Sequence, residues 1–116
     1  MEQDIVKKTI ESLMKDRHVK QILTDTFFQS KSVEELCEKF SIPMAICSQK
    51  VRALERLGML VCDHSFRFKN DTKVKYYRSD LLNTHFIFKP DDLYLRFEIL
   101  PKIPHNYPRW LTVRLS

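Results

Sequence analysis

The chain has a single glycine, Gly58, among its 116 residues. Phosphate-binding loops, dinucleotide-binding fingerprints and oxyanion loops each need several glycines, because the backbone must closely approach the bound group. The sequence therefore excludes nucleotide-dependent enzymes of these kinds. It also lacks an apolar run of about 18 residues, the length that a membrane-spanning helix requires, and its charged N-terminus lacks the apolar core of a secretory signal.

Cysteine is scarce too, with three residues and no CxxC pair. An odd number of cysteines does not form a complete disulfide framework, and without a CxxC pair the cysteines lack the usual spacing of zinc ligands. Without an export signal, the sequence predicts reduced thiols in a cytoplasmic protein. Cys37 and Cys47 lie on apolar stripes, where cysteine behaves as a small buried hydrophobe. We therefore expect no metal, no cofactor and no small-molecule effector.

Catalytic groupings are missing as well. The adjacent carboxylates of Asp91 and Asp92 follow Pro90 in a turn, and turn chemistry accounts for them. No nucleophile stands in a recognisable pattern with a base. We expect that the protein is not an enzyme.

Positive charge is concentrated in two parts of the chain. The net charge is +5, and residues 41–80 carry 8 basic and 4 acidic side chains. Residues 101–116 carry 3 basic and no acidic side chains, whereas residues 1–40 and 81–100 each have a net charge of −1. This distribution is typical of a protein with an anionic partner, although lysine and arginine also serve as plain solubilising residues.

Apolar residues at helical spacing predict four helices before Gly58. The first covers residues 4–15 and the second residues 19–27. Ser32 and Glu35 form a capping box that opens the third helix. Pro43 suits the first turn of the fourth helix, and Gly58 suits its left-handed end.

After Gly58 the apolar period changes toward two, which predicts strands. A first hairpin covers residues 60–79, and its alternating residues before the turn are Leu60, Cys62, His64, Phe66 and Phe68. A second hairpin covers residues 86–99, and residues 111–115 alternate as a last strand. The predicted fold class is α+β, with a length that suits a single core.

Two helices, a tight turn and a hairpin within about 60 residues are the order of a winged helix-turn-helix. The segments VEELCEKFSIP, from Val33, and SQKVRALERLGML, from Ser48, resemble winged-helix transcription regulators, most closely the small repressors of the ArsR-like group. The resemblance covers residues 18–79. It implies a winged helix-turn-helix that binds duplex DNA and regulates transcription. Relatives bind metals through paired thiolates, but Lys39 stands where the partner of Cys37 would be.

The resemblance makes residues 43–57 the recognition helix, whose N-terminal half reaches base edges in the major groove. Gln49 can pair with adenine and Arg52 with guanine or phosphate, while Ser48 and Lys50 suit backbone oxygens. The residues expected on its DNA-facing side are Met44, Ala45, Ser48, Gln49, Lys50 and Arg52. The plain alternative is an ordinary solvated helix face.

The first hairpin, at residues 60–79, is the expected wing. A basic ribbon of this kind follows phosphates or enters the minor groove, although lysines also protect strand edges from aggregation. The wing residues expected to bind DNA are Arg67, Lys69, Lys73 and Lys75, and Arg78 adds a fifth positive charge to the hairpin.

Small winged-helix repressors act as dimers on pseudo-palindromic sites, so the resemblance implies a homodimer. The apolar stripe expected to form its interface consists of Val6, Ile10, Leu13 and Met14. We expect residues 1–80 to form the DNA-binding domain with its N-terminal helix, and residues 81–116 to pack on the same domain. The alternative function is a winged-helix module that binds protein within a multi-subunit assembly.

Overall fold

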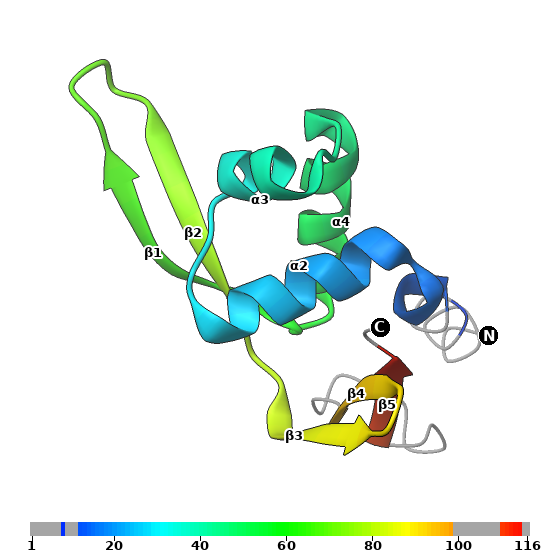
Figure 1. The fold of residues 1–116 in the computed structure, drawn as a ribbon. Helices are drawn as coiled ribbons and strands as arrows, with labels where there is room; N and C mark the ends of the chain where they lie inside the picture. Colours follow the sequence, from blue (N-terminus) through cyan, green and yellow to red (C-terminus); the bar gives the residue numbers. More distant parts are fainter. Residues whose placement is uncertain (1–7, 9–11, 99–109, 115–116) are drawn as a thin grey trace. The chain divides into compact units, whose positions relative to one another are not determined.

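The computed structural model describes residue 8, residues 12–98 and residues 110–114 of the chain (Figure 1). Residues 12–15 are helical. The helices that follow are α2 (Arg17–Phe28), α3 (Val33–Phe40) and α4 (Met44–Arg56). The strands are β1 (Leu60–Arg67), β2 (Lys73–Ser79), β3 (Leu82–Lys89), β4 (Asp92–Glu98) and β5 (Trp110–Arg114). The α+β class is therefore confirmed.

Contacts divide the chain into two compact units. One unit is Gln21–Asp80, which holds most of α2, then α3, α4 and the β1–β2 hairpin. The other unit combines Met1–Lys20 with Leu81–Ser116. Of the expected interface stripe, Leu13 and Met14 are half-buried helical residues, whereas Val6 and Ile10 lie outside the described residues.

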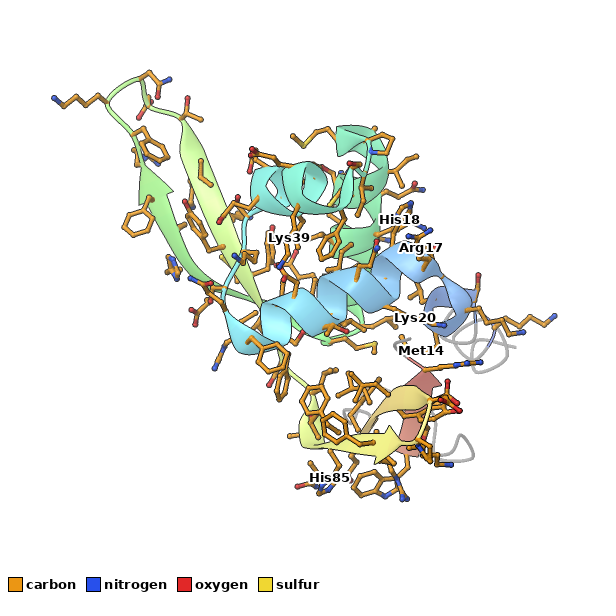
Figure 2. All side chains as sticks on the ribbon, viewed as in Figure 1. Met14, Arg17, His18, Lys20, Lys39 and His85 are labelled. Carbon is orange, nitrogen blue, oxygen red and sulfur yellow. The ribbon has the colours of Figure 1, made fainter. Side chains whose placement is uncertain are left out.

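The helices of the Gln21–Asp80 unit pack through the stripes that the sequence predicts. α3 contacts α4, and α4 contacts β1. Within this unit, α2, α3, α4 and β1 contribute the buried apolar side chains Ile22, Leu23, Leu36, Cys47, Val51, Leu54 and Leu60. Lys39 of α3 also pairs with Asp25 of α2 (Figure 2). The apolar faces hold the three helices together, because burial of each large side chain is worth about 2 kcal/mol.

Local capping determines where α3 begins and ends. The Ser32 hydroxyl accepts a hydrogen bond from the Glu35 N–H at 3.2 Å, and the Glu35 carboxylate accepts one from the Ser32 N–H at 3.1 Å. The predicted capping box is therefore confirmed. Ser41 ends the helix with a left-handed φ of 54°. α4 begins at Met44, one residue after Pro43, and the left-handed φ of 79° at Gly58 follows its end.

The β1–β2 hairpin contains an irregularity that its sequence pattern conceals. β1 pairs antiparallel with β2, but the register shifts between Cys62, opposite Tyr77, and His64, opposite Tyr76. Asp63 is therefore an extra residue, as in a β-bulge. Because directly opposite residues share a face, Leu60 and Cys62 lie on one face of the hairpin while His64 lies on the other.

This bulge corrects the expectation of one alternating stripe along residues 60–68. The stripe is split between two faces, and its outer part is not a core stripe. Phe66 is 55% exposed and Phe68 is 51% exposed. The period-2 pattern misled because one inserted residue reverses the direction of every later side chain on the strand.

The remaining strands form a separate sheet of the order β3-β4-β5, with both pairs antiparallel. The second predicted hairpin is thus β3–β4, and residues 111–114 of the expected last strand pair with β4. Leu95 and Phe97 on β4 are buried. Alternation gives β4 an inward side, as expected of a central strand. None of the helices within the described part of the chain is long and apolar enough to cross a bilayer.

The capping box gives a direct test of the α3 boundary. Ser32→Ala should lower the free energy of unfolding by about 1 kcal/mol, because a partly buried Glu35 N–H loses its acceptor. Urea denaturation followed by circular dichroism measures this change. Ser65→Ala, on an exposed position of β1, is the matched control and should stay within about 0.5 kcal/mol of the wild type. Equal effects of the two substitutions would contradict a stabilising capping box.

Candidate nucleic-acid interface

α4 turns one side to the core and the other to solvent, as its spacing predicts. Cys47, Val51 and Leu54 are buried at intervals of four and three residues. Of the residues predicted to face DNA, Met44, Ala45, Gln49 and Arg52 are exposed, whereas Ser48 and Lys50 are half-buried.

Arg52 lies along its own helix. Its Nε donates a hydrogen bond to the Ser48 carbonyl oxygen, one turn earlier, at 3.3 Å. This contact orients the guanidinium group on the exposed side of α4, one turn from Gln49. An arginine and an amide at this spacing on one helix face are the side-chain types that read guanine and adenine.

The hairpin has two chemically different faces, and the side chains in Figure 2 project from both of its sides. Strand register pairs Ser65 with Lys75 and Arg67 with Lys73. These four exposed residues share one side of the hairpin, which we call the cationic face. The opposite pairs, which we call the aromatic face, are His64 with Tyr76 and Phe66 with Val74.

The aromatic face is organised by ring contacts. The His64 imidazole stacks on the Tyr76 ring with centroids 4.7 Å apart, and the Phe66 ring meets the Tyr76 ring edge-on at 5.7 Å. Sequence reasoning interpreted these residues as part of an ordinary strand pattern and missed the exposed cluster. The signal that could have found it is the large number of aromatic residues at a hairpin tip, where little core is available to bury them.

The buried position of Tyr77 indicates which side of the hairpin lies toward the helices. The backbones of Tyr77 and Lys31 exchange hydrogen bonds of 2.9 and 2.8 Å just before α3. The Tyr77 side chain is 7% exposed, and burial raises its pKa, with a further rise from the charge of Glu55 on α4. The opposing influence of Arg52 on this pKa indicates that the guanidinium also lies nearby. Since Lys73 and Lys75 precede Tyr77 at alternate positions of β2 and so share its side of the strand, the cationic face lies on the α4 side of the hairpin.

Both arginines of the hairpin form ion pairs with aspartates. Arg67 pairs with Asp71 in the turn at 3.1 Å, and both side chains are well exposed. Arg78, on the aromatic side, pairs with Asp63 at 3.7 Å. Among the described residues, no ion pair involves Lys69, Lys73 or Lys75. These three lysines therefore offer their full charge to an outside anion.

Asp63 is the acidic residue of the bulge, and its carboxylate has three side-chain partners: Ser30, His64 and Arg78. The Ser30 hydroxyl donates a hydrogen bond to its carboxylate at 2.6 Å, and the His64 ring lies 3.2 Å away. The Ser30 bond, followed by the His64 bond and the charge of Arg78, lowers the pKa of Asp63. The Asp63 charge is thus held on the aromatic side, away from the cationic face.

Acidic residues limit the positive surface on its α3 side. Glu34, Glu35 and Glu38 are exposed on α3, and the charge of Glu34 contributes to the raised pKa of Tyr77. A polyanion bound by α4 and the cationic face would therefore have to lie toward the hairpin tip and the exposed side of α4, because α3 repels it.

Cysteine, histidine and acidic side chains are the other groups that could carry chemistry. Among the described residues, no group of three histidine, cysteine or acidic side chains is placed to hold a metal ion. Asp92 accepts hydrogen bonds from Arg114 and Tyr94, so its carboxylate has structural partners. Asp91 is an exposed turn residue.

Comparison with known proteins does not extend this description. The sequence matches no family model and no curated protein, and the fold matches no solved structure.

Burial of Cys47 predicts a pH dependence of stability. Burial, followed by a hydrogen bond and charge from Cys37 and by the charge of Glu34, raises the pKa of the Cys47 thiol from 9.0 to about 12. Between these values the unfolded chain binds fewer protons than the folded chain. The free energy of unfolding should therefore be unaffected by this thiol below pH 9 and should fall as pH rises from about 9 toward about 12.

Urea denaturation of wild type and Cys47→Ala at pH about 8 and about 11 measures this loss. The variant should lose less stability than the wild type over that interval, after subtraction of the constant packing cost of the substitution. Cys62→Ala, at an exposed thiol, is the control and should follow the wild type. An identical pH dependence for Cys47→Ala would show that the thiol does not titrate in this way.

Proposed function

We propose that the chain is a winged helix-turn-helix regulator of transcription, with α3 and α4 as the helix-turn-helix and the β1–β2 hairpin as the wing. The likeness to ArsR-like repressors suggests this class, and the element order supports it. The observation that carries the proposal is the position of the cationic face on the α4 side of the hairpin, through its alternation with Tyr77. Such a regulator acts in the cytoplasm and has no enzymatic step.

In this proposal α4 enters the major groove with its exposed side toward the bases. Gln49 pairs with adenine, and Arg52 pairs with guanine or reaches a phosphate. Ser48 and Lys50, at the border of the exposed side, bind backbone oxygens and set the register of the helix. Met44 and Ala45 in the first turn contact thymine methyl groups, which suit apolar side chains.

The wing supplies non-specific affinity. Arg67, Lys73 and Lys75 on the cationic face, together with Lys69 in the turn, neutralise phosphates beside the groove that α4 occupies. Each neutralised phosphate should add about 0.9 to the slope of log affinity against log salt concentration.

Matched substitutions on the two faces test this assignment. Lys73→Ala and Lys75→Ala should each weaken binding to random duplex DNA and reduce the salt slope by about 1, because each removes one phosphate contact. Arg78→Ala removes the same charge from the opposite face of the same strand, next to Asp63, and should leave the slope nearly unchanged. Fluorescence anisotropy at two or more salt concentrations gives both quantities.

Two outcomes count against the proposal. Equal losses for Arg78→Ala and Lys75→Ala would mean that only total charge matters and that the cationic face has no particular role. If the wild type does not bind duplex DNA even at low salt, the DNA-binding function is wrong. Arg52→Ala should also weaken binding to duplex DNA relative to the wild type, and circular dichroism checks that α4 is intact in this variant.

A second candidate function is a module that binds another protein, and one observation favours it. Met44 is 48% exposed and Ile46 is 40% exposed on the first turns of α4. Exposed apolar side chains of this size are typical of a protein-binding surface. Ile46→Ser should leave duplex binding almost unchanged if α4 reads DNA through its polar residues, and it should abolish partner binding in the alternative.

We also propose that the regulator acts as a homodimer through the N-terminal stripe. Leu13 and Met14 are only half-buried in the single chain, which leaves apolar surface for a second copy. Sedimentation equilibrium should show a dimer for the wild type, and Met14→Glu should shift it to monomer because a charge would enter the interface. Lys15→Glu, at the adjacent exposed position, is the control and should remain dimeric. A monomeric wild type would contradict the proposal.

A further inference from the structure

The aromatic face of the hairpin carries large exposed rings. Phe66 is 55% exposed, and Phe68, two residues further along the chain, is 51% exposed. The His64 ring beside them is exposed as well. Folded proteins usually bury most of such rings, so a group of exposed rings at adjoining positions indicates a binding surface.

The rings hold one another in fixed orientations. The His64 ring stacks on the Tyr76 ring, and the Phe66 ring lies nearly perpendicular to both, at interplanar angles of 75° and 83°. Because these rings are ordered before any ligand arrives, a flat ligand that stacks on Phe66 pays little for ordering its side chain. A preorganised ring favours another ring as its ligand, since stacking adds to the plain burial of apolar area.

The charge of the hairpin indicates that this flat ligand is also an anion. Residues 60–79 carry five basic and two acidic side chains, and both acidic ones, Asp63 and Asp71, are paired with arginines. Among the described residues, Lys69, Lys73 and Lys75 take part in no ion pair. Flat rings linked to a repeated negative charge are the chemistry of a nucleic-acid strand.

The free edge of β2 lets one ligand reach both kinds of group. Within the described part of the chain, β2 pairs only with β1 and, at Tyr77, with Lys31. Lys73 and Lys75 lie on one side of this edge and Tyr76 on the other. The long, flexible lysine stems bring their ammonium groups to the rim of the strand. A ligand backbone along this edge would have its phosphates near the lysines and its bases turned onto the rings.

We propose that the hairpin binds single-stranded nucleic acid, with bases stacked on the aromatic face and phosphates held by Lys73 and Lys75. The bases of a duplex stack on one another and hide their faces, whereas those of a single strand are free to stack on protein rings. Two residues of extended chain place Phe66 and Phe68 about 7 Å apart. This is about twice the base spacing of 3.4 Å in one strand of a duplex, so an extended strand can place one base on each ring.

This binding goes beyond the proposed reading of duplex DNA and does not depend on α4. Because both ligands use Lys73 and Lys75, only substitutions of the rings separate the two activities. Fluorescence anisotropy of the full-length chain with labelled oligo(dT) and oligo(U) of about ten nucleotides measures single-strand binding, at a length that one binding module covers. A labelled random duplex is measured in parallel.

We expect single strands to bind with an affinity that falls as the salt concentration rises. The oligo(dT) and oligo(U) arms identify whether DNA or RNA is the source of the ligand, and binding of either one supports the inference. If neither binds at low salt, the inference is wrong.

Substitutions of Phe66 separate stacking from charge and from plain hydrophobicity. Phe66→Leu keeps an apolar side chain but removes the ring, and it should lower the single-strand affinity about tenfold while leaving the duplex affinity unchanged. Phe66→Trp supplies a larger ring and should bind single strands at least as tightly as the wild type. Phe88→Leu, at an 80% exposed ring of β3, is the matched control and should bind single strands as the wild type does.

The same measurements can overturn the inference in two further ways. Single-strand affinity that is unchanged in Phe66→Leu would show that bases do not stack on the aromatic face. Equal losses in Phe66→Leu and Phe88→Leu would show that the position of the ring does not matter. Failure of duplex binding alone would overturn the proposed function and leave this inference standing.

Discussion

The orientation of the β1–β2 hairpin depends on Tyr77. Its backbone pairs with Lys31 immediately before α3, and its side chain is buried beside α4. Because a strand alternates its side chains, one buried position determines which residues of β2 lie toward α4 and which lie away. The cationic face, and with it the proposed surface for a polyanion, follows from this single anchored residue.

Helices and their ends were the part of the structure most accessible from sequence. The Ser32–Glu35 capping box and the left-handed residue at Gly58 are local chemistry, determined by residues within a few positions of each other. The apolar stripe of Cys47, Val51 and Leu54 likewise depends only on helical spacing. Local patterns of this kind predict the positions of α3 and α4 within one or two residues.

The two faces of the hairpin could not be predicted from the same pattern. Their identity depends on the bulge at Asp63, which is stabilised by a hydrogen bond from Ser30, far away in the sequence. The contact between Cys37 and Met44 could not be predicted for a similar reason. Only the packing of α3 on α4 brings the Cys37 thiol to the Met44 thioether. Contacts between elements leave no trace in periodicity.

The bulge makes backbone geometry, rather than composition alone, a determinant of the surface chemistry. If Asp63 instead took a regular place in the ladder, His64 and Phe66 would move to the side now shared by Tyr77 and Lys75. Aromatic rings and ammonium groups would then lie together on one side, without a change in any amino acid. Deletion of Asp63 itself would preserve both faces, so this position should tolerate the loss of one residue better in evolution than the rest of the strand does.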